Sequence, residues 1–165
     1  MYGIINIQKK AEDIMKLAEA LILRADLQKR MAQVRQRIYK NVLVQDGEKP
    51  SENPNTLISE FMGLQEKLSN IIKSINKTNN ETVFDETMML YEALVKRDDI
   101  LSRRNILISA ADHASDRQDR YSLTEIKYVS VINVEQFQKE ADNLAKEYRK
   151  LDTKIQGLNW NTDLI

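Results

Sequence analysis

The sequence has no cysteine and is poor in the residues that bend or break a helix. Its 165 residues include four glycines and two prolines. The lack of cysteine excludes disulfides, thiolate metal sites and thiol nucleophiles, and it is typical of a protein in a reducing compartment. The scarcity of glycine and proline favours long helices over folds built from many tight turns. We therefore expect a helical protein in the cytoplasm.

The sequence also lacks an excess of one charge and any long apolar run. Lys and Arg together number 25, as do Asp and Glu, so the formal net charge is zero. This balance gives no overall field that would attract nucleic acid or an acidic membrane surface. The longest apolar runs, such as residues 20–23 and 106–108, fall far short of the roughly 20 residues that a membrane-spanning helix needs. We expect neither nucleic acid nor a membrane as a partner.

The first 14 residues lack the features of a secretion signal, since they contain neither a continuous apolar core nor a small-residue cleavage site. From Met15 onward the sequence reads as a natural start followed by a helix. We therefore interpret residues 1–14 as an extension upstream of the native start. The whole chain, residues 1–165, has a suitable length for a single domain with its own core.

Two segments repeat apolar residues at alternating steps of four and three. This spacing is typical of long amphipathic helices that pack as in a coiled coil. The first segment contains Leu57, Phe61, Leu64, Leu68, Ile71 and Ile75, and the second contains Val134, Phe137, Ala141, Leu144, Tyr148, Leu151, Ile155 and Leu158. The pattern predicts helices over residues 54–76 and 134–156.

Two further helices are predicted over residues 8–44 and 87–114. The first has two overlapping apolar stripes, formed by Ile14, Leu17 and Leu21 and by Leu23, Leu27, Met31, Val34 and Ile38. An amphipathic surface helix needs one stripe, so the other must meet another helix of the chain or a second subunit. We expect self-association, with Leu23, Leu27 and Met31 on the remaining face. In the helix over residues 87–114, the predicted inward residues are Leu90, Tyr91, Leu94, Leu101 and Ile108.

The predicted fold class is all-α: an antiparallel bundle of about four long helices, with a small non-helical excursion between the third and the fourth. Residues 76–80 should end the second helix and Gly157 the fourth, and Trp160 should fold back onto the bundle. Within the excursion, residues 126–132 are rich in β-branched and aromatic side chains and are compatible with a short strand.

Several segments resemble a bacterial family of uncharacterised proteins, some of whose members are labelled septicolysin. The resemblance spans nearly everything from Met15 to the end of the chain. It rests on residues 15–30 (MKLAEALILRADLQKR), 76–79 (NKTN), 117–130 (RQDRYSLTEIKYVS), 151–156 (LDTKIQ) and Asn159 with Trp160. The label implies a pore-forming cytolysin of the thiol-activated kind. The resemblance implies no active-site residues, because no established site can be carried over.

A search for catalytic or metal-binding groups yields little. His113 is the single histidine, and no serine lies in the strained turn of a nucleophile. Asp112, His113, Asp116 and Asp119 could supply metal ligands, but a charged, solvated helix end explains them better. No glycine-rich phosphate loop is present. We expect no metal, no cofactor and no catalytic residue.

Polar residues interrupt the apolar rows of the first and third helices. Continuing these rows by helical steps reaches Arg24 in the first and Asp98 in the third. These helices run parallel in an up-down-up-down bundle, so Arg24 and Asp98 are predicted to form a buried polar pair that fixes the helix register. A hidden catalytic centre is the alternative, but its usual histidine and Glu-x-x-His pattern are missing.

The segment containing Arg117, Asp119, Arg120 and Tyr121 is the best candidate for recognition. Two guanidinium groups, an acid and an aromatic ring suit contact with a carboxylate, a phosphate or another subunit. A structural clasp held by Arg–Asp pairs is the alternative. Taken together, the sequence favours a homo-oligomer that acts by interaction. The alternatives are an enzyme or a binder of a small anionic ligand at this segment, and a membrane-active cytolysin.

Overall fold

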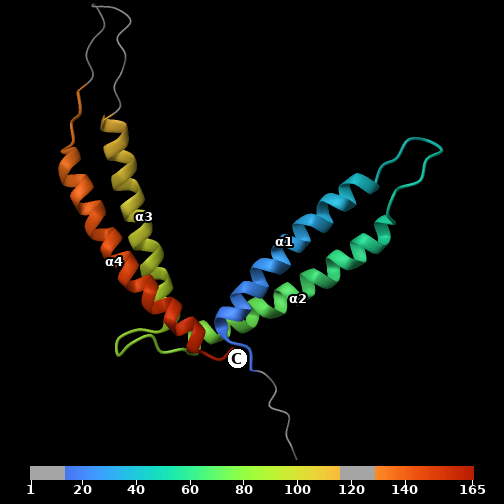
Figure 1. The fold of residues 1–165 in the computed structure, drawn as a ribbon, viewed down its shortest axis with the longest axis horizontal. Coiled ribbons are helices and arrows are strands. Elements are labelled where there is room, and N and C mark those ends of the chain that lie inside the picture. Colours follow the sequence, from blue (N-terminus) through green and yellow to red (C-terminus); the bar gives the residue numbers. More distant parts are fainter. Residues whose placement is uncertain (1–13, 116–128) are drawn as a thin grey trace, which may run out of the picture. The chain divides into compact units, whose positions relative to one another are not determined.

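The computed structural model describes residues 14–115 and 129–165, which form four α-helices (Figure 1). Their bounds are Leu17–Asn41 for α1, Pro54–Glu81 for α2, Leu90–Ser115 for α3 and Val134–Asn161 for α4. In the described residues, β-structure is confined to two isolated bridges, Lys16 with Asp163 and Val83 with Met89. The predicted all-α class is confirmed.

The contacts within the chain divide it into two compact units. The first comprises the chain up to Thr82 together with Asn159–Ile165, and the second comprises Val83–Leu158. The first unit therefore contains the α1–α2 hairpin, and the second contains α3 and most of α4. That the whole chain forms one domain stays a prediction.

The first unit is built on an apolar seam between α1 and α2. The central cluster consists of Leu27, Met31, Val34, Leu64 and Leu68, with Ile38, Phe61, Ile71 and Ile72 packed against it. The four-three seam predicted for α2 is thus confirmed. The nomination of Leu27 and Met31 for a face left free is wrong, because both side chains are buried against α2. Leu23, the third residue predicted for that face, is exposed, as is Ile22.

Ion pairs flank this seam and show that α1 and α2 are antiparallel. Arg30 of α1 pairs with Glu60 of α2 at 2.7 Å, and Arg37, about two turns later, pairs with Glu52 just before α2 begins. Since later residues of α1 meet earlier residues beside α2, the two helices run in opposite directions. Both pairs are partly solvent-exposed, so they add little to stability beyond the burial of the seam.

The second unit packs α3 against α4, which lie side by side in Figure 1. The seam predicted for α4 is confirmed by the burial of Ala141, Leu144 and Ile155. The row predicted for α3 is largely wrong: the fully buried residues of this helix are Leu90, Ala93, Ile100 and Ala111, whereas Tyr91 is exposed and Leu94, Leu101 and Ile108 are half-buried. Small alanines at the contact allow two helices to approach closely, so the bulkier apolar residues of α3 lie beside the seam.

Three helix ends in the structure differ from the predicted ones, and contacts with other parts of the chain accompany them. α1 begins at Leu17, where the Glu19 carboxylate accepts a hydrogen bond from the Lys16 backbone N–H. α2 continues through residues 76–80 to Glu81, and Thr78 within this stretch is fully buried. The Thr78 hydroxyl accepts a 2.9 Å hydrogen bond from the Ile165 N–H, so a polar residue here has a specific partner.

The end of α4 differs from its prediction in the same way. Gly157 lies inside α4, and the helix continues to Asn161. The last residues then fold back: Leu17 N–H donates to Thr162 O at 2.9 Å, and Leu164 N–H donates to Met15 O at 2.8 Å. Trp160 does not pack as predicted, because 55% of its surface is exposed. Residues 129–132 form no strand, and the rest of the predicted strand lies outside the described residues.

We predict that Leu64→Ala lowers the free energy of unfolding by about 2–5 kcal/mol, because it opens a cavity in the α1–α2 cluster. Urea denaturation followed by circular dichroism measures the change. Met62→Ala is the matched control, since Met62 lies on the same helix and is 61% exposed. Equal losses in the two variants would show that the seam is assigned to the wrong face of α2.

Candidate functional site

The connection between α1 and α2 is a firmly anchored loop. Asn41, buried at the end of α1, donates through Nδ2 to Arg37 O at 2.9 Å and accepts at Oδ1 from the Glu52 N–H at 2.9 Å. The Arg37 guanidinium makes two hydrogen bonds to the Glu52 carboxylate, one of them 3.0 Å from Nε to Oε2. This bonding lowers the pKa of Glu52. Both ends of the loop are therefore tied to the same turn of α1.

The middle of the loop reverses the chain in a tight turn. Glu48 N–H donates to Gln45 O at 2.9 Å, and Gly47 has a φ of +85°, a left-handed conformation that glycine adopts at low cost. Asn53 then caps the start of α2, its Oδ1 accepting from the Asn55 N–H at 2.9 Å. The path of the loop is thus set by local hydrogen bonds.

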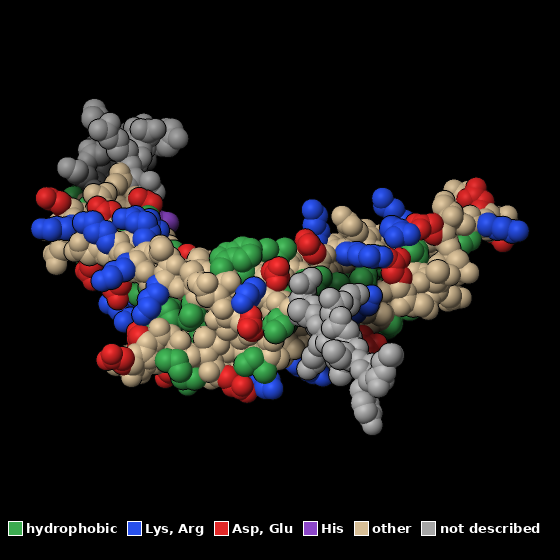
Figure 2. Space-filling model, turned by 60° about the horizontal axis from the view of Figure 1, so that its bottom comes forward, with side chains coloured by type: hydrophobic (Ala, Val, Ile, Leu, Met, Phe, Trp, Pro, Cys, Tyr) green, Lys and Arg blue, Asp and Glu red, His purple; other side chains and the backbone are tan. Residues whose placement is uncertain are grey.

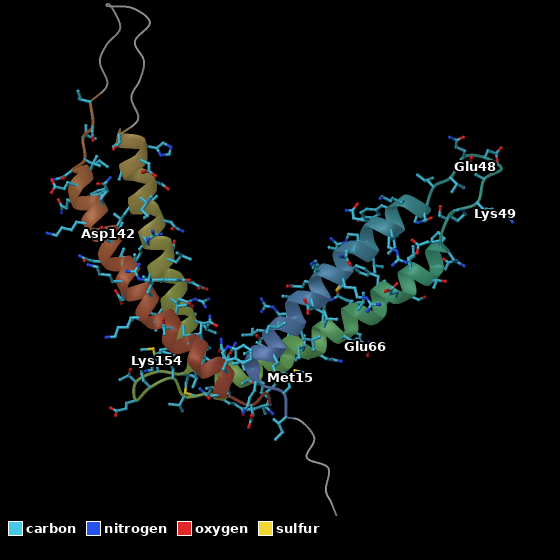
Figure 3. All side chains as sticks on the ribbon, in the orientation of Figure 1. Met15, Glu48, Lys49, Glu66, Asp142 and Lys154 are labelled. Atoms are coloured by element: carbon cyan, nitrogen blue, oxygen red, sulfur yellow. The ribbon has the colours of Figure 1, made fainter. Side chains whose placement is uncertain are left out.

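A hollow of about 420 Å³ lies on this loop, and three exposed aliphatic residues stand beside it. Its lining includes Lys40, Leu43, Val44, Glu48, Lys49 and Pro50. Figure 3 shows Glu48 and Lys49 at the end of the connection. The exposed fractions of Val42, Leu43 and Val44 are 50%, 85% and 46%. The sequence predicts these three residues as the end of the helix over residues 8–44, whereas α1 ends at Asn41 and leaves the apolar run outside the helix.

In the second unit, Asp85 organises the segment before α3. Its Oδ1 accepts from Thr87 N–H at 2.9 Å, from the Thr87 hydroxyl at 2.8 Å and from Met88 N–H at 3.2 Å. The Lys154 ammonium of α4 lies 3.7 Å from Asp85 Oδ2 and 4.2 Å from the centroid of the Phe84 ring. The Thr87 hydrogen bonds chiefly, with the charge of Lys154, lower the pKa of Asp85. This arrangement joins the start of α3 to α4.

Arg97 is the polar residue at the contact of α3 with α4, where the sequence predicted Asp98. The guanidinium is half-buried and lies 2.8 Å from Asp98 Oδ1 and 3.5 Å from Asp152 Oδ1 of α4. Both Arg24 and Asp98 are exposed, so the prediction that they are buried is wrong. The row used to place Asp98 is one residue away from the true seam of α3. A contact between Arg24 and Asp98, which belong to different units, stays a prediction.

The other sequence candidates cluster around the end of α3. Arg117, Asp119, Arg120 and Tyr121 lie outside the described residues, so their recognition role stays a prediction. Asp116 lies outside them as well. Asp112 and His113 are exposed, and His113 Nδ1 is 2.7 Å from Ser109 O. In residues 14–115 and 129–165, no group of three acidic or histidine side chains is placed to hold a metal ion.

The outer side of α3 is a second surface of note. Tyr91, Val95 and Ile106 are exposed at 44%, 67% and 66%. Separations of 4 and 11 residues return to nearly the same side of a helix, so the three side chains form a stripe. The stripe faces away from the buried row of Leu90, Ala93, Ile100 and Ala111. Figure 2 shows hydrophobic side chains lying among charged ones on the molecular surface.

Comparison with known proteins places the chain in a family. A family model described as a family of unknown function, DUF6847, matches residues 24–164. The chain belongs to DUF6847. The DUF6847 match includes α2, α3 and α4 completely and α1 from Arg24 onward. No curated protein matches the chain.

A solved structure supports the fold assigned to this DUF6847 protein. It is the crystal structure of a functionally unknown conserved protein from Corynebacterium diphtheriae, 42% identical to the chain, with a TM-score of 0.84. The alignment covers 92% of this chain and 99% of that one. The predicted resemblance to uncharacterised bacterial proteins is thus confirmed, and neither comparison confirms the septicolysin label. Among the described residues, no helix combines the length and the apolarity needed to cross a membrane.

We predict that acid unfolding depends partly on Asp85. Because its pKa is lower in the folded chain than in the unfolded one, the ionised carboxylate stabilises the fold above the ordinary aspartate pKa of about 4. That stabilisation is lost as the pH falls through the lowered value. Asp85→Asn should therefore be less stable than wild type at pH 7 and should lose less stability on acidification. Urea midpoints between pH 2 and pH 7 measure this.

The control for Asp85→Asn is Glu66→Gln, which removes an exposed carboxylate of α2 that has no partner among the described residues (Figure 3). Its urea midpoints should follow those of wild type across the range. Parallel acid profiles for Asp85→Asn and wild type would contradict a role for the Asp85 turn.

A further prediction concerns Arg97. Arg97→Ala should lower the free energy of unfolding by about 1–3 kcal/mol, because it removes a half-buried side chain and leaves Asp152 without its partner. The control is Arg103→Ala, whose exposed pair with Asp99 at 3.7 Å should contribute no more than about 0.5 kcal/mol. Thermal and urea unfolding of the two variants measure the difference, and a larger loss for Arg103→Ala would contradict the assigned seam.

Proposed function

We propose that this DUF6847 protein acts by self-association, as a homo-oligomer that presents helical surfaces to partners and has no catalytic site of its own. The observation that supports this proposal most directly is the exposed stripe of Tyr91, Val95 and Ile106 on α3. A helix that is apolar on both sides normally has a neighbour on both sides. Within its unit, α3 has α4 on one side.

A second copy of the chain suits this stripe. Ser102 lies between Val95 and Ile106 on the same side of α3, and the exposed Asp99 lies at the edge of the stripe. Two copies related by a two-fold axis can lay the same stripe against itself, with Tyr91 of one copy toward Ile106 of the other. Burial of six apolar side chains is then the main favourable term, and exposed Asp99 and Arg103 can pair at the edge.

The other functions considered for this chain stay predictions. An enzyme or a binder of a small anionic ligand would depend on Arg117, Asp119, Arg120 and Tyr121. A cytolysin would depend on the septicolysin label alone. Location in the cytoplasm is consistent with the absence of cysteine. The self-association proposal has more direct support, because the structure describes the residues of the α3 stripe. The enzyme and ligand-binding alternatives depend on residues that it does not describe.

We predict that Val95→Asp with Ile106→Asp reduces the mass of the assembly. Two carboxylates at the centre of an apolar contact would have to be buried without partners, which is strongly unfavourable. Gel filtration with light scattering at about 10–100 μM, a range in which weak contacts are populated, measures the mass. Helix content by circular dichroism should stay that of wild type, because both side chains are exposed.

The matched control is Val129→Asp with Val131→Asp, which places the same charges at two other exposed residues of the second unit. This variant should keep the wild-type mass. A wild-type protein that is monomeric throughout the concentration range would overturn the proposed function. An unchanged mass in the Val95/Ile106 variant would show that the α3 stripe is not part of the self-association contact.

A further inference from the structure

The loop between α1 and α2 has a surface that its own fold does not explain. Val42, Leu43 and Val44 follow one another outside the helices with their side chains exposed, and Leu43 is among the most exposed large apolar residues described. Three consecutive exposed apolar residues are unfavourable in water unless another molecule covers them. The hollow bordered by Leu43 and Val44 lies beside them on the same loop.

This surface is held in place before any partner arrives. Asn41 joins both ends of the loop through hydrogen bonds of 2.9 Å, and the Arg37–Glu52 pair closes the loop from the side. A loop ordered in advance loses little conformational entropy on binding, so even a small apolar contact can give useful affinity. The anchoring also explains how aliphatic side chains stay exposed, since the chain cannot turn them inward without breaking these bonds.

The charges around the exposed residues favour a second copy of the chain as the partner. Lys40 and Lys49 lie around the hollow, and Asp46 and Glu48 balance them within a few residues. A surface without net charge attracts neither an acidic bilayer nor nucleic acid. A surface with both charges is complementary to a copy of itself turned by a two-fold axis, because each lysine can then face an acid.

We propose that this loop is a two-fold contact between two copies of the chain. Leu43 and Val44 of one copy pack on the same residues of the other, and Lys49 of each copy enters the polar hollow of its partner near Glu48. This gives an apolar centre with a charged rim, the usual arrangement of protein interfaces. The inference rests on the proposed self-association and adds a second surface to it, in the first unit of the chain.

The first test is Leu43→Asp in the full chain, studied by sedimentation equilibrium. Two new carboxylates would meet at the centre of the contact, so the association constant of this step should fall by about tenfold or more. The control Val131→Asp puts the same charge at another strongly exposed aliphatic residue and should change the constant by no more than about twofold. Leu43 is 85% exposed, so the variant should keep its helix content.

A charge exchange tests whether two loops meet. Glu48→Lys gives a loop with excess positive charge, and Lys49→Glu gives one with excess negative charge. Each variant alone should associate more weakly than wild type, because like charges then face each other. An equimolar mixture of the two should associate at least as well as wild type, because opposite charges face each other. Neither change touches a buried side chain.

The outcomes separate this inference from the proposed function. A monomeric wild type overturns both. An oligomeric wild type that neither Leu43→Asp nor the charge exchange affects overturns the loop contact and leaves the α3 stripe. Binding of monomeric protein to phosphatidylcholine–phosphatidylserine vesicles that Leu43→Asp abolishes also overturns it, in favour of a lipid surface. Weakened association in Leu43→Asp together with rescue in the mixed charge variants supports the contact.

Discussion

The structure depends on the limited apolar surface that two helices can bury between them. A hairpin of two helices covers one stripe on each, and in the first unit that stripe is filled by Leu27, Met31 and Val34 of α1 against Leu64 and Leu68 of α2. Any apolar side chain outside the stripe stays in water unless a further element covers it. The arrangement of polar anchors, exposed stripes and loop surface follows from this limit.

Polar side chains contribute mainly by fixing the ends of the helices. Asn41 and the Arg37–Glu52 pair set the α1–α2 connection, Asp85 sets the start of α3, and Thr78 receives the backbone of Ile165. Most of these groups are close to solvent, where an ion pair adds little free energy. Their effect is geometric: they determine where each helix stops and how the chain returns. The stability itself comes from the burial of the apolar seams.

How far the sequence predicts the fold depends on side-chain size. The seams of α2 and α4 are predictable because bulky residues such as Leu64, Leu68 and Ile155 occupy the contact positions. The seam of α3 is not, since Ala93 and Ala111 lie at the contact while the larger Leu101 and Ile108 of the predicted row are half-buried beside it. A pattern that ranks positions by hydrophobicity therefore selects the wrong row, and it places Asp98 where Arg97 lies. The prediction of helix ends fails for a related reason. Residues 76–80 resemble a helix break, but the Thr78 hydroxyl accepts a hydrogen bond from Ile165, 87 residues away.

The candidate surfaces are also only partly predictable, and the reason is physical. The expectation of self-association comes from an excess of apolar surface, which composition and periodicity reveal. Where that excess lies depends on which stripe the partner helix covers, and this is decided by packing. The prediction named Leu23, Leu27 and Met31, but packing buries Leu27 and Met31. Further exposed apolar surface lies at Val42, Leu43 and Val44 in one unit and at Tyr91, Val95 and Ile106 in the other. The two proposed contacts, one in each unit, would be two-fold contacts of two different kinds. Their combination would yield assemblies larger than a dimer, closed if the axes meet and open if they do not.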